Sequence, residues 1–264
     1  MKIYILTDME GVSGIVSFDE CAPSSPNFTR SKRLATLEVN AAIEGILSTG
    51  DHEIVVFDGH GPGGIEFELL HKSARLVMGR PVDMLFYMDK EQYDACMIIG
   101  QHAMRNTPFA NLHHTFNSKT VISLTINNHL IGEAGVAALR AGIYDIPTIL
   151  LSGDRAACDE IETIIPNIHT CEVKKGLNTT SAVCLAPEMA REKIKSSAAF
   201  AMNHMSDIKP YKLEPPYIAE WVFFDSKELI PYMNKDYCKI IQPNKVQIYA
   251  EDMEDLIKNK LWGF

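Results

Sequence analysis

The 264-residue sequence has no long apolar run and no excess of positive charge. No stretch approaches the roughly 20 apolar residues that span a bilayer, and the formal net charge is −9. Nucleic acids and anionic membranes bind basic surfaces, so neither is an expected partner. The lysines of the pairs Lys174-Lys175 and Lys193/Lys195 are predicted to be solvated surface groups.

Paired cysteines and a signal peptide are also missing. The six cysteines are scattered, with no Cys-x-x-Cys pair, and the N-terminus shows no signal-peptide h-region. We therefore expect a cytoplasmic protein with reduced, mostly buried cysteines. None has the histidine and acid context of a catalytic nucleophile. The cysteines are Cys21, Cys96, Cys158, Cys171, Cys184 and Cys238.

The sequence does contain a series of short apolar runs, typical of strands that are buried on both faces. Helical patterns separate several of them, which predicts an α/β fold: a mostly parallel sheet sandwiched by helices in three layers (αβα). The predicted strands cover residues 1–6, 53–57, 93–100, 147–152 and 168–173.

The last third of the chain has a different pattern, with a helix predicted at 187–205, strands at 217–224 and 245–249, and a helix at 252–261. We expect a metal-binding α/β domain over residues 1–178 and a smaller C-terminal α+β portion over residues 179–264. Within the first domain, residues 120–127 alternate and predict a strand exposed on one face. Asn127-Asn128 is suited to a hairpin turn after that strand.

Acidic and histidine residues follow three of the predicted parallel strands. Asp8 and Glu10 follow the first strand, Asp58 and His60 the second, and His102 the third. The carboxyl ends of parallel strands lie at one edge of a sheet, where ligands bind in open α/β folds. These side chains are therefore expected to converge although they are far apart in the sequence.

Glu133 opens a predicted helix that packs on the same sheet and can complete a metal site. Mixed nitrogen and oxygen ligation suits Zn²⁺ and tolerates Mn²⁺, Fe²⁺ or Co²⁺. Five ligands exceed the needs of one tetrahedral ion, so we predict two metals with Asp8 as the bridge. Singly, each residue also fits a structural role, as a turn acid, a core histidine or a helix N-terminal acid. The predicted ligands are Asp8, Glu10, His60, His102 and Glu133.

A reaction also needs a group that is not a ligand, and His113-His114 lies in a loop after His102. An unligated imidazole has a pKa near 6.5 and can move protons at neutral pH. The alternative is an exposed histidine pair in a polar loop. The other histidines have no such context and are predicted to be surface or core residues; they are His52, His71, His129, His169 and His204.

Four segments of the chain resemble motifs of the DppA-type D-aminopeptidases (peptidase family M55), which are zinc-dependent aminopeptidases. Asp8-Met9-Glu10-Gly11 resembles the D-x-E-G motif, and Asp58-Gly59-His60 resembles D-x-H. Gly100-Gln101-His102-Ala103 resembles G-x-H-A, and Gly132-Glu133 resembles G-E. Thr7 stands where the family often has Ser. The resemblance covers residues 1 to about 154 well and the remainder more loosely.

The resemblance implies a D-aminopeptidase that holds two zinc ions per subunit on the five predicted ligands, with Asp8 shared. It also implies a catalytic histidine in a His-Ser/Thr-hydrophobic context. His114-Thr115-Phe116 fits that context, whereas His113 fits the spacing from Thr107-Pro108 better. The resemblance also implies a ring-shaped homo-oligomer, a decamer, with an internal channel that restricts substrates to short peptides. The substrates it implies are peptides with D-amino acids of the D-Ala type.

Two other functions fit the same ligand set. Another binuclear metallohydrolase is one, either an amidase for cell-wall peptides or a phosphoesterase. A phosphoesterase is expected to contain an N-H-[DE] segment, but Asn128-His129 is followed by Leu130 and Asn203-His204 by Met205. A non-catalytic, metal-stabilised binding module is the other, and it requires no spare histidine. The residues and the resemblance together favour the metallo-aminopeptidase.

Overall fold

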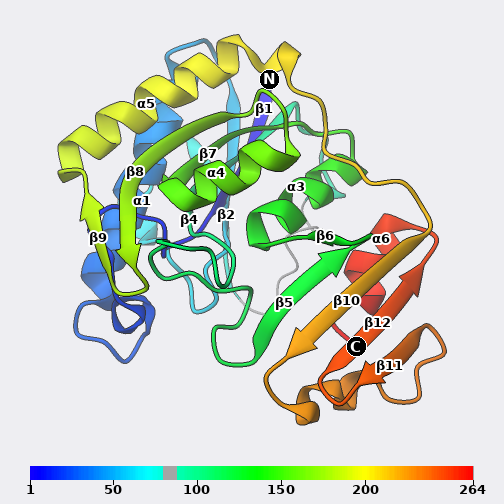
Figure 1. The fold of residues 1–264 in the computed structure, drawn as a ribbon. Coiled ribbons are helices and arrows are strands. Elements are labelled where there is room, and N and C mark those ends of the chain that lie inside the picture. The colour runs from blue at the N-terminus through cyan, green and yellow to red at the C-terminus, as the bar shows by residue number, and fades with distance from the viewer. Residues whose placement is uncertain (80–87, 264) are drawn as a thin grey trace.

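The computed structural model describes residues 1–79 and 88–263, and these residues form two β-sheets with helices around and between them (Figure 1). In the first sheet all neighbouring strands are parallel except the last pair. In spatial order its strands are β3 (Ala74–Val77), β2 (Glu53–Asp58), β1 (Lys2–Thr7), β4 (Ala95–Gln101), β7 (Thr148–Asp154), β8 (His169–Asn178) and β9 (Ser181–Cys184).

The second sheet is antiparallel and lies beside the first (Figure 1). In spatial order its strands are β11 (Cys238–Gln242), β12 (Lys245–Ala250), β10 (Tyr217–Phe223), β5 (Val121–Ile126) and β6 (His129–Leu130). Asn127 and Asn128 form the turn between β5 and β6 with φ values of 50° and 65°. Asparagine tolerates this left-handed backbone, as the sequence predicted.

Helices cover both faces of the first sheet. Helices α1 (Phe28–Leu47) and α5 (Pro187–Asn203) pack together on one face, and α3 (Glu133–Ile143) and α4 (Arg155–Ile164) pack together on the other (Figure 1). Strands β1, β2, β4 and β7 are consequently buried along almost their whole length. The predicted three-layer α/β fold is confirmed. No helix among the described residues has both the length and the apolar composition needed to cross a membrane.

The change from one sheet to the other does not coincide with the predicted domain boundary at residue 178. β5 and β6 precede that residue but belong to the antiparallel sheet, whereas β9 and α5 follow it but belong to the first. Helix α3 contributes to both cores: Val136 and Leu139 pack into the second, and Ala137 and Ala138 pack into the first. Glu133, at the N-terminus of α3, therefore lies where the two cores meet.

After β2 the chain forms a short 3₁₀ turn, Phe67–Leu69. One predicted helix, at 252–261, differs in kind. The final helix is a single α-helical turn, α6 (Met253–Asp255), that continues as a π-helix over Leu256–Lys260. Elsewhere, all six cysteines are free, and four of them are buried.

Candidate metal centre

The central strands of the first sheet carry the predicted ligands to one place. β1 lies between β2 and β4, so the segments after these three strands are neighbours. Asp8, Glu10, His60 and His102 are all buried there. Glu133 reaches the same place from the N-terminus of α3, which lies against β4 and β7.

The side chains form two groups of potential metal ligands. In the first, His60 Nδ1 lies 3.4 Å from Asp8 Oδ1 and 3.1 Å from Glu10 Oε2. In the second, His102 Nε2 lies 3.2 Å from Glu133 Oε1. The other Asp8 oxygen, Oδ2, is 3.3 Å from His102 Nε2. Asp8 therefore faces both groups, one oxygen to each.

Backbone carbonyls orient the three histidine rings. In each ring one nitrogen is placed to donate its hydrogen to a carbonyl oxygen, which leaves the other nitrogen facing the carboxylates. The acceptors are the carbonyls of Cys21 (2.9 Å from His60 Nε2), Ala103 (2.8 Å from His102 Nδ1) and Leu112 (2.9 Å from His114 Nδ1).

This orientation places lone pairs of nitrogen and oxygen against each other in a buried space. Among the described residues, Glu10 Oε2 and His102 Nε2 are buried polar atoms without a hydrogen-bond partner. Facing acceptors repel each other unless a cation lies between them, either a proton or a metal ion. The residues therefore fit a metal centre, and their nitrogen and carboxylate donors suit zinc.

Electrostatics in the centre favour bound cations. Burial is the largest single influence on His60 and favours the neutral imidazole, but the charges and hydrogen bonds of Glu10 and Asp8 together outweigh it and raise the pKa to about 11. At His102 burial is again the largest single influence, but the charge and hydrogen bond of Glu133 together with the charges of Asp8 and Glu10 outweigh it and raise the pKa to about 10. A metal ion competes with protons for these nitrogens, because metal ligation requires the deprotonated form.

His114 differs from the other two histidines. Burial, and then the charge of His102, lower the pKa of His114, so its imidazole is neutral at neutral pH. Burial and the charge of Glu10 raise the pKa of Asp8 to about 7. Groups whose pKa values are driven apart are typical of sites that perform acid–base chemistry.

The structure also separates the two candidate catalytic histidines. His114 Nε2 is 3.7 Å from Glu133 Oε1, and the His114 ring stacks on His102 with 3.8 Å between centroids. His113 instead accepts from the Asn106 N–H at 3.1 Å and lies 3.1 Å from the Thr179 hydroxyl. Thus His114 lies in the centre and His113 is engaged elsewhere. His114 also belongs to the second ligand group, a role that the sequence did not suggest.

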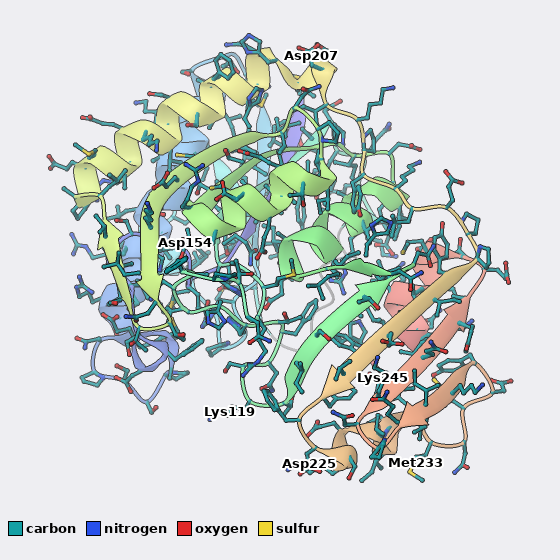
Figure 2. All side chains as sticks on the ribbon, in the orientation of Figure 1. Lys119, Asp154, Asp207, Asp225, Met233 and Lys245 are labelled. Atoms are coloured by element: carbon teal, nitrogen blue, oxygen red, sulfur yellow. The ribbon has the colours of Figure 1, made fainter. Side chains whose placement is uncertain are left out.

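A cleft of about 340 Å³ opens onto the two groups. Phe18 and Phe116 supply apolar surface, and Lys119 is the one lysine or arginine among the lining residues. Figure 2 shows Lys119 in the loop that leads to β5, between the two sheets. The cleft can therefore receive a small ligand that combines apolar and anionic parts.

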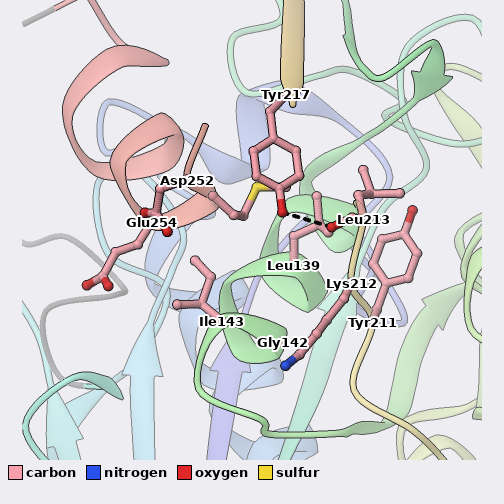
Figure 3. A pocket seen from close by; sticks show the side chains of 10 residues that line it. Leu139, Gly142, Ile143, Tyr211, Lys212, Leu213, Tyr217, Asp252 and Glu254 are labelled. Carbon is pink, nitrogen blue, oxygen red and sulfur yellow. Dashed lines mark hydrogen bonds between the residues drawn. The ribbon is translucent and has the colours of Figure 1, made fainter. Parts of the chain in front are cut away.

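A second hollow, of about 190 Å³, lies between α3, the segment 211–213 and α6 (Figure 3). The Tyr217 hydroxyl donates to the Leu213 carbonyl there at 2.9 Å. None of the residues of the two ligand groups lines this hollow, so it is separate from the centre.

Comparison with known proteins identifies the family. Residues 1–260 match the model of peptidase family M55, described as D-aminopeptidase. The chain belongs to this D-aminopeptidase family. It is 32% identical over 219 residues to the D-aminopeptidase of Bacillus subtilis (strain 168), covering 82% of this chain and 78% of that protein. The predicted family and the predicted metallo-aminopeptidase class are confirmed.

A solved structure extends the comparison to three dimensions. This M55 chain superimposes on the Zn-dependent D-aminopeptidase DppA from Bacillus subtilis, a self-compartmentalizing protease, with a TM-score of 0.88 and 28% identity. The match covers 96% of this chain and 93% of that chain. The α/β fold, including the second sheet, is therefore a fold of the family.

Some residues of this M55 centre were not recognised from sequence. Gln101, between two motif residues, donates from Nε2 to Asp8 Oδ2 at 3.2 Å. The Phe116 N–H donates to Glu133 Oε1 at 2.6 Å. Asp58, placed with the converging residues in the sequence, instead accepts from the N–H groups of Gly64 and Ile65 and orders the loop that carries His60.

The sequence prediction was wrong for Lys174, which is buried rather than solvated. The pairing of β7 with β8 changes register between Gly153 and Asp154, and the neighbours Val173 and Lys174 are both buried. A register shift breaks the alternation of inward and outward side chains. Alternation along β8 would place Lys174 outside, and nothing in its sequence indicates the shift.

Proposed function

We propose that the chain is a binuclear zinc aminopeptidase that removes the N-terminal residue of short peptides, with a preference for D-amino acids of the D-Ala type. The observation that carries the proposal is the position of Asp8, with one carboxylate oxygen toward each ligand group. The identity of the metal is supported by the zinc dependence of the solved relative. The stereochemical preference is supported by the family and by both relatives, each described as a D-aminopeptidase.

In this proposal Asp8, Glu10 and His60 hold one ion, and Asp8, His102 and Glu133 hold the other. When bound, the ions supply Lewis acidity, which polarises a peptide carbonyl and lowers the pKa of water. The neutral His114 holds its Nδ1 hydrogen on the Leu112 carbonyl. Its Nε2 is therefore free to accept a proton during attack and to return it to the leaving amine.

The rest of the site restricts access. The N–H of Phe116 fixes Glu133, and the ring of Phe18 packs edge-to-face on His114 at 5.5 Å. Together they keep these side chains in place and limit water around the reacting bond. The volume of the cleft suits a short peptide better than a folded chain.

The solved relative is a self-compartmentalizing protease, and we propose that this chain likewise assembles into a ring-shaped homo-oligomer, a decamer. An internal channel would restrict substrates to short peptides. The cytoplasmic location stays a prediction. A phosphoesterase is less well supported, because Lys119 is the single lysine or arginine that lines the cleft.

Metal content and substrate selectivity test the proposal together. After loading with Zn²⁺ and removal of free metal, mass spectrometry should find two zinc ions per chain. Hydrolysis of D-alanyl p-nitroanilide should exceed that of the L-isomer. Fewer than one zinc ion per chain would contradict the binuclear centre, and cleavage of the L-isomer alone would contradict the stereochemical assignment.

Lys119 gives a prediction about how a dipeptide lies in the cleft. With the N-terminus at the metals, the free carboxylate is expected to extend toward Lys119. Hydrogen bonds to charged groups contribute about 1.5–3 kcal/mol when buried, and solvent weakens this for an exposed lysine. We expect Lys119→Met to raise KM for D-Ala-D-Ala by roughly threefold to tenfold.

D-alanyl p-nitroanilide, which lacks the carboxylate, is the matched control for Lys119→Met. Its KM should remain within about twofold of the wild-type value. Steady-state kinetics with both substrates make the comparison. An equal change for both would show that Lys119 does not bind the carboxylate.

A further inference from the structure

Lys174 on β8 is a buried cation next to the loop after β1, which carries Asp8 and Glu10. Only 1% of its surface is exposed. Its Nζ donates to the carbonyl of Glu10 at 2.5 Å, the carbonyl of Ile15 at 2.6 Å and Asn111 Oδ1 at 2.8 Å. All three ammonium hydrogens are thus used on neutral oxygens. Two of these oxygens belong to the backbone of the loop that follows β1.

Asn111 extends this contact to the loop that carries His114. Its Nδ2 donates to the carbonyls of Val16 and Thr179 at 3.2 Å and 3.0 Å. Its backbone N–H donates to Asp154 Oδ2 at 2.8 Å. Lys174 and Asn111 therefore connect the loop after β1, the loop before β5 and the end of β7, where Figure 2 shows Asp154.

A buried ammonium is costly. Removing it from water costs several kcal/mol, and the acid in this network, Asp154, bonds to Asn111 rather than to Lys174. An apolar side chain of similar length would avoid this cost. It could not satisfy the inward-facing carbonyls of Glu10 and Ile15, which a donor must reach from β8.

We infer that Lys174 is a positioning residue for the metal centre. By holding the Glu10 carbonyl it fixes the backbone that aims the Glu10 carboxylate at His60. By holding Asn111, which lies in the same loop as His114, it keeps the loop after β1 at a constant distance from the loop of His114. The inference rests on the proposed function in one respect, that Asp8, Glu10 and His60 bind an ion.

Lys174→Met tests the inference, because methionine nearly matches the length of lysine but has no donor. Outer partners of metal ligands typically contribute 10–100-fold to metal affinity. We expect one of the two zinc dissociation constants to rise by roughly 10–100-fold and the other to stay within about threefold. Competition with a chromophoric chelator measures both constants without reference to activity.

Lys175→Met is the matched control, since Lys175 is exposed on the same strand. Both zinc dissociation constants of Lys175→Met should equal those of the wild type. Asn111→Ala is the second variant, which removes one of the three acceptors and retains the lysine. It should raise the dissociation constant of the same zinc ion by a smaller factor, and it keeps the inference testable if Lys174→Met does not fold.

A purely structural role predicts a different result. If Lys174→Met or Asn111→Ala folds with a lower Tm, but both zinc dissociation constants are unchanged or rise by the same factor, the inference is overturned. The wild type is measured first. Failure of the wild type to bind two ions would contradict the proposed binuclear function, whereas two ions in the wild type with no selective loss in the variants would contradict only the role of Lys174.

Discussion

Asp8→Asn is expected to abolish hydrolysis and to leave at most one zinc ion per chain. Asparagine preserves the shape of the side chain, but one carboxylate oxygen becomes an amide group that cannot ligate a cation. The two Asp8 oxygens are 3.4 Å from His60 and 3.3 Å from His102, so either amide orientation disrupts one group. Activity should fall by more than the ~100-fold that loss of an outer partner can cause.

Asp94→Asn is the matched control for this variant. Asp94 accepts from the backbone N–H of Lys2 at 2.6 Å, so it lies at the opposite edge of the same sheet. Its loss should leave zinc content and kcat unchanged. Metal analysis and kinetics on both variants decide the matter, and full activity in Asp8→Asn would refute metal-dependent hydrolysis.

His114→Gln is expected to lower kcat by ~10²–10⁴-fold, the usual contribution of a general acid–base. Glutamine can form a hydrogen bond but cannot exchange a proton at neutral pH. Both zinc ions should remain bound, because Asp8, His102 and Glu133 still surround the second site. The measurements are kcat and zinc content of the same preparation.

The control for His114→Gln is His113→Gln, because His113 bonds to Asn106 and Thr179 rather than to the centre. Its kcat should stay within about threefold of the wild type. Burial lowers the pKa of His114. In the pH profile of kcat, the apparent pKa of the acid limb should therefore lie below the ordinary histidine pKa of about 6.5. Loss of one zinc ion in His114→Gln would instead identify His114 as a ligand.

The convergence of the predicted ligands could be foreseen because it depends on a regular feature. Continuous apolar runs indicated parallel strands, and parallel strands bring their carboxyl ends to one edge. Asp8, His60 and His102 follow β1, β2 and β4, which are adjacent in the sheet. No side-chain detail was needed for this part of the prediction.

Features set by irregular backbone could not be predicted. Leu112 and Phe116, on either side of the histidine pair, have left-handed φ values of 51° and 56°. Such values are uncommon outside glycine and asparagine, so the sequence could not decide whether His113 or His114 turns inward. Lys174 was misplaced for a related reason, because the register shift in β8 has no local sequence signal.

Pairing between distant strands was also out of reach. The alternation at 120–127 correctly indicated a strand, although its residues are buried or half-buried rather than exposed on one face, and an alternating pattern does not specify a partner. β5 pairs with β10, about 100 residues later in the chain, and so belongs to the second sheet. Long-range pairing of this kind depends on tertiary packing rather than on local pattern.

The order of these segments has a consequence for biosynthesis. A ribosome has completed every predicted ligand once it reaches Glu133, about halfway along the chain. At that point β7, β8 and β10 do not exist, so β4 and β5 each lack one of their two neighbours and the Glu10 carbonyl lacks the ammonium of Lys174. A nascent chain therefore carries all the predicted ligands before their strands have assembled, and translation of the later strands sets when the predicted metal centre can form.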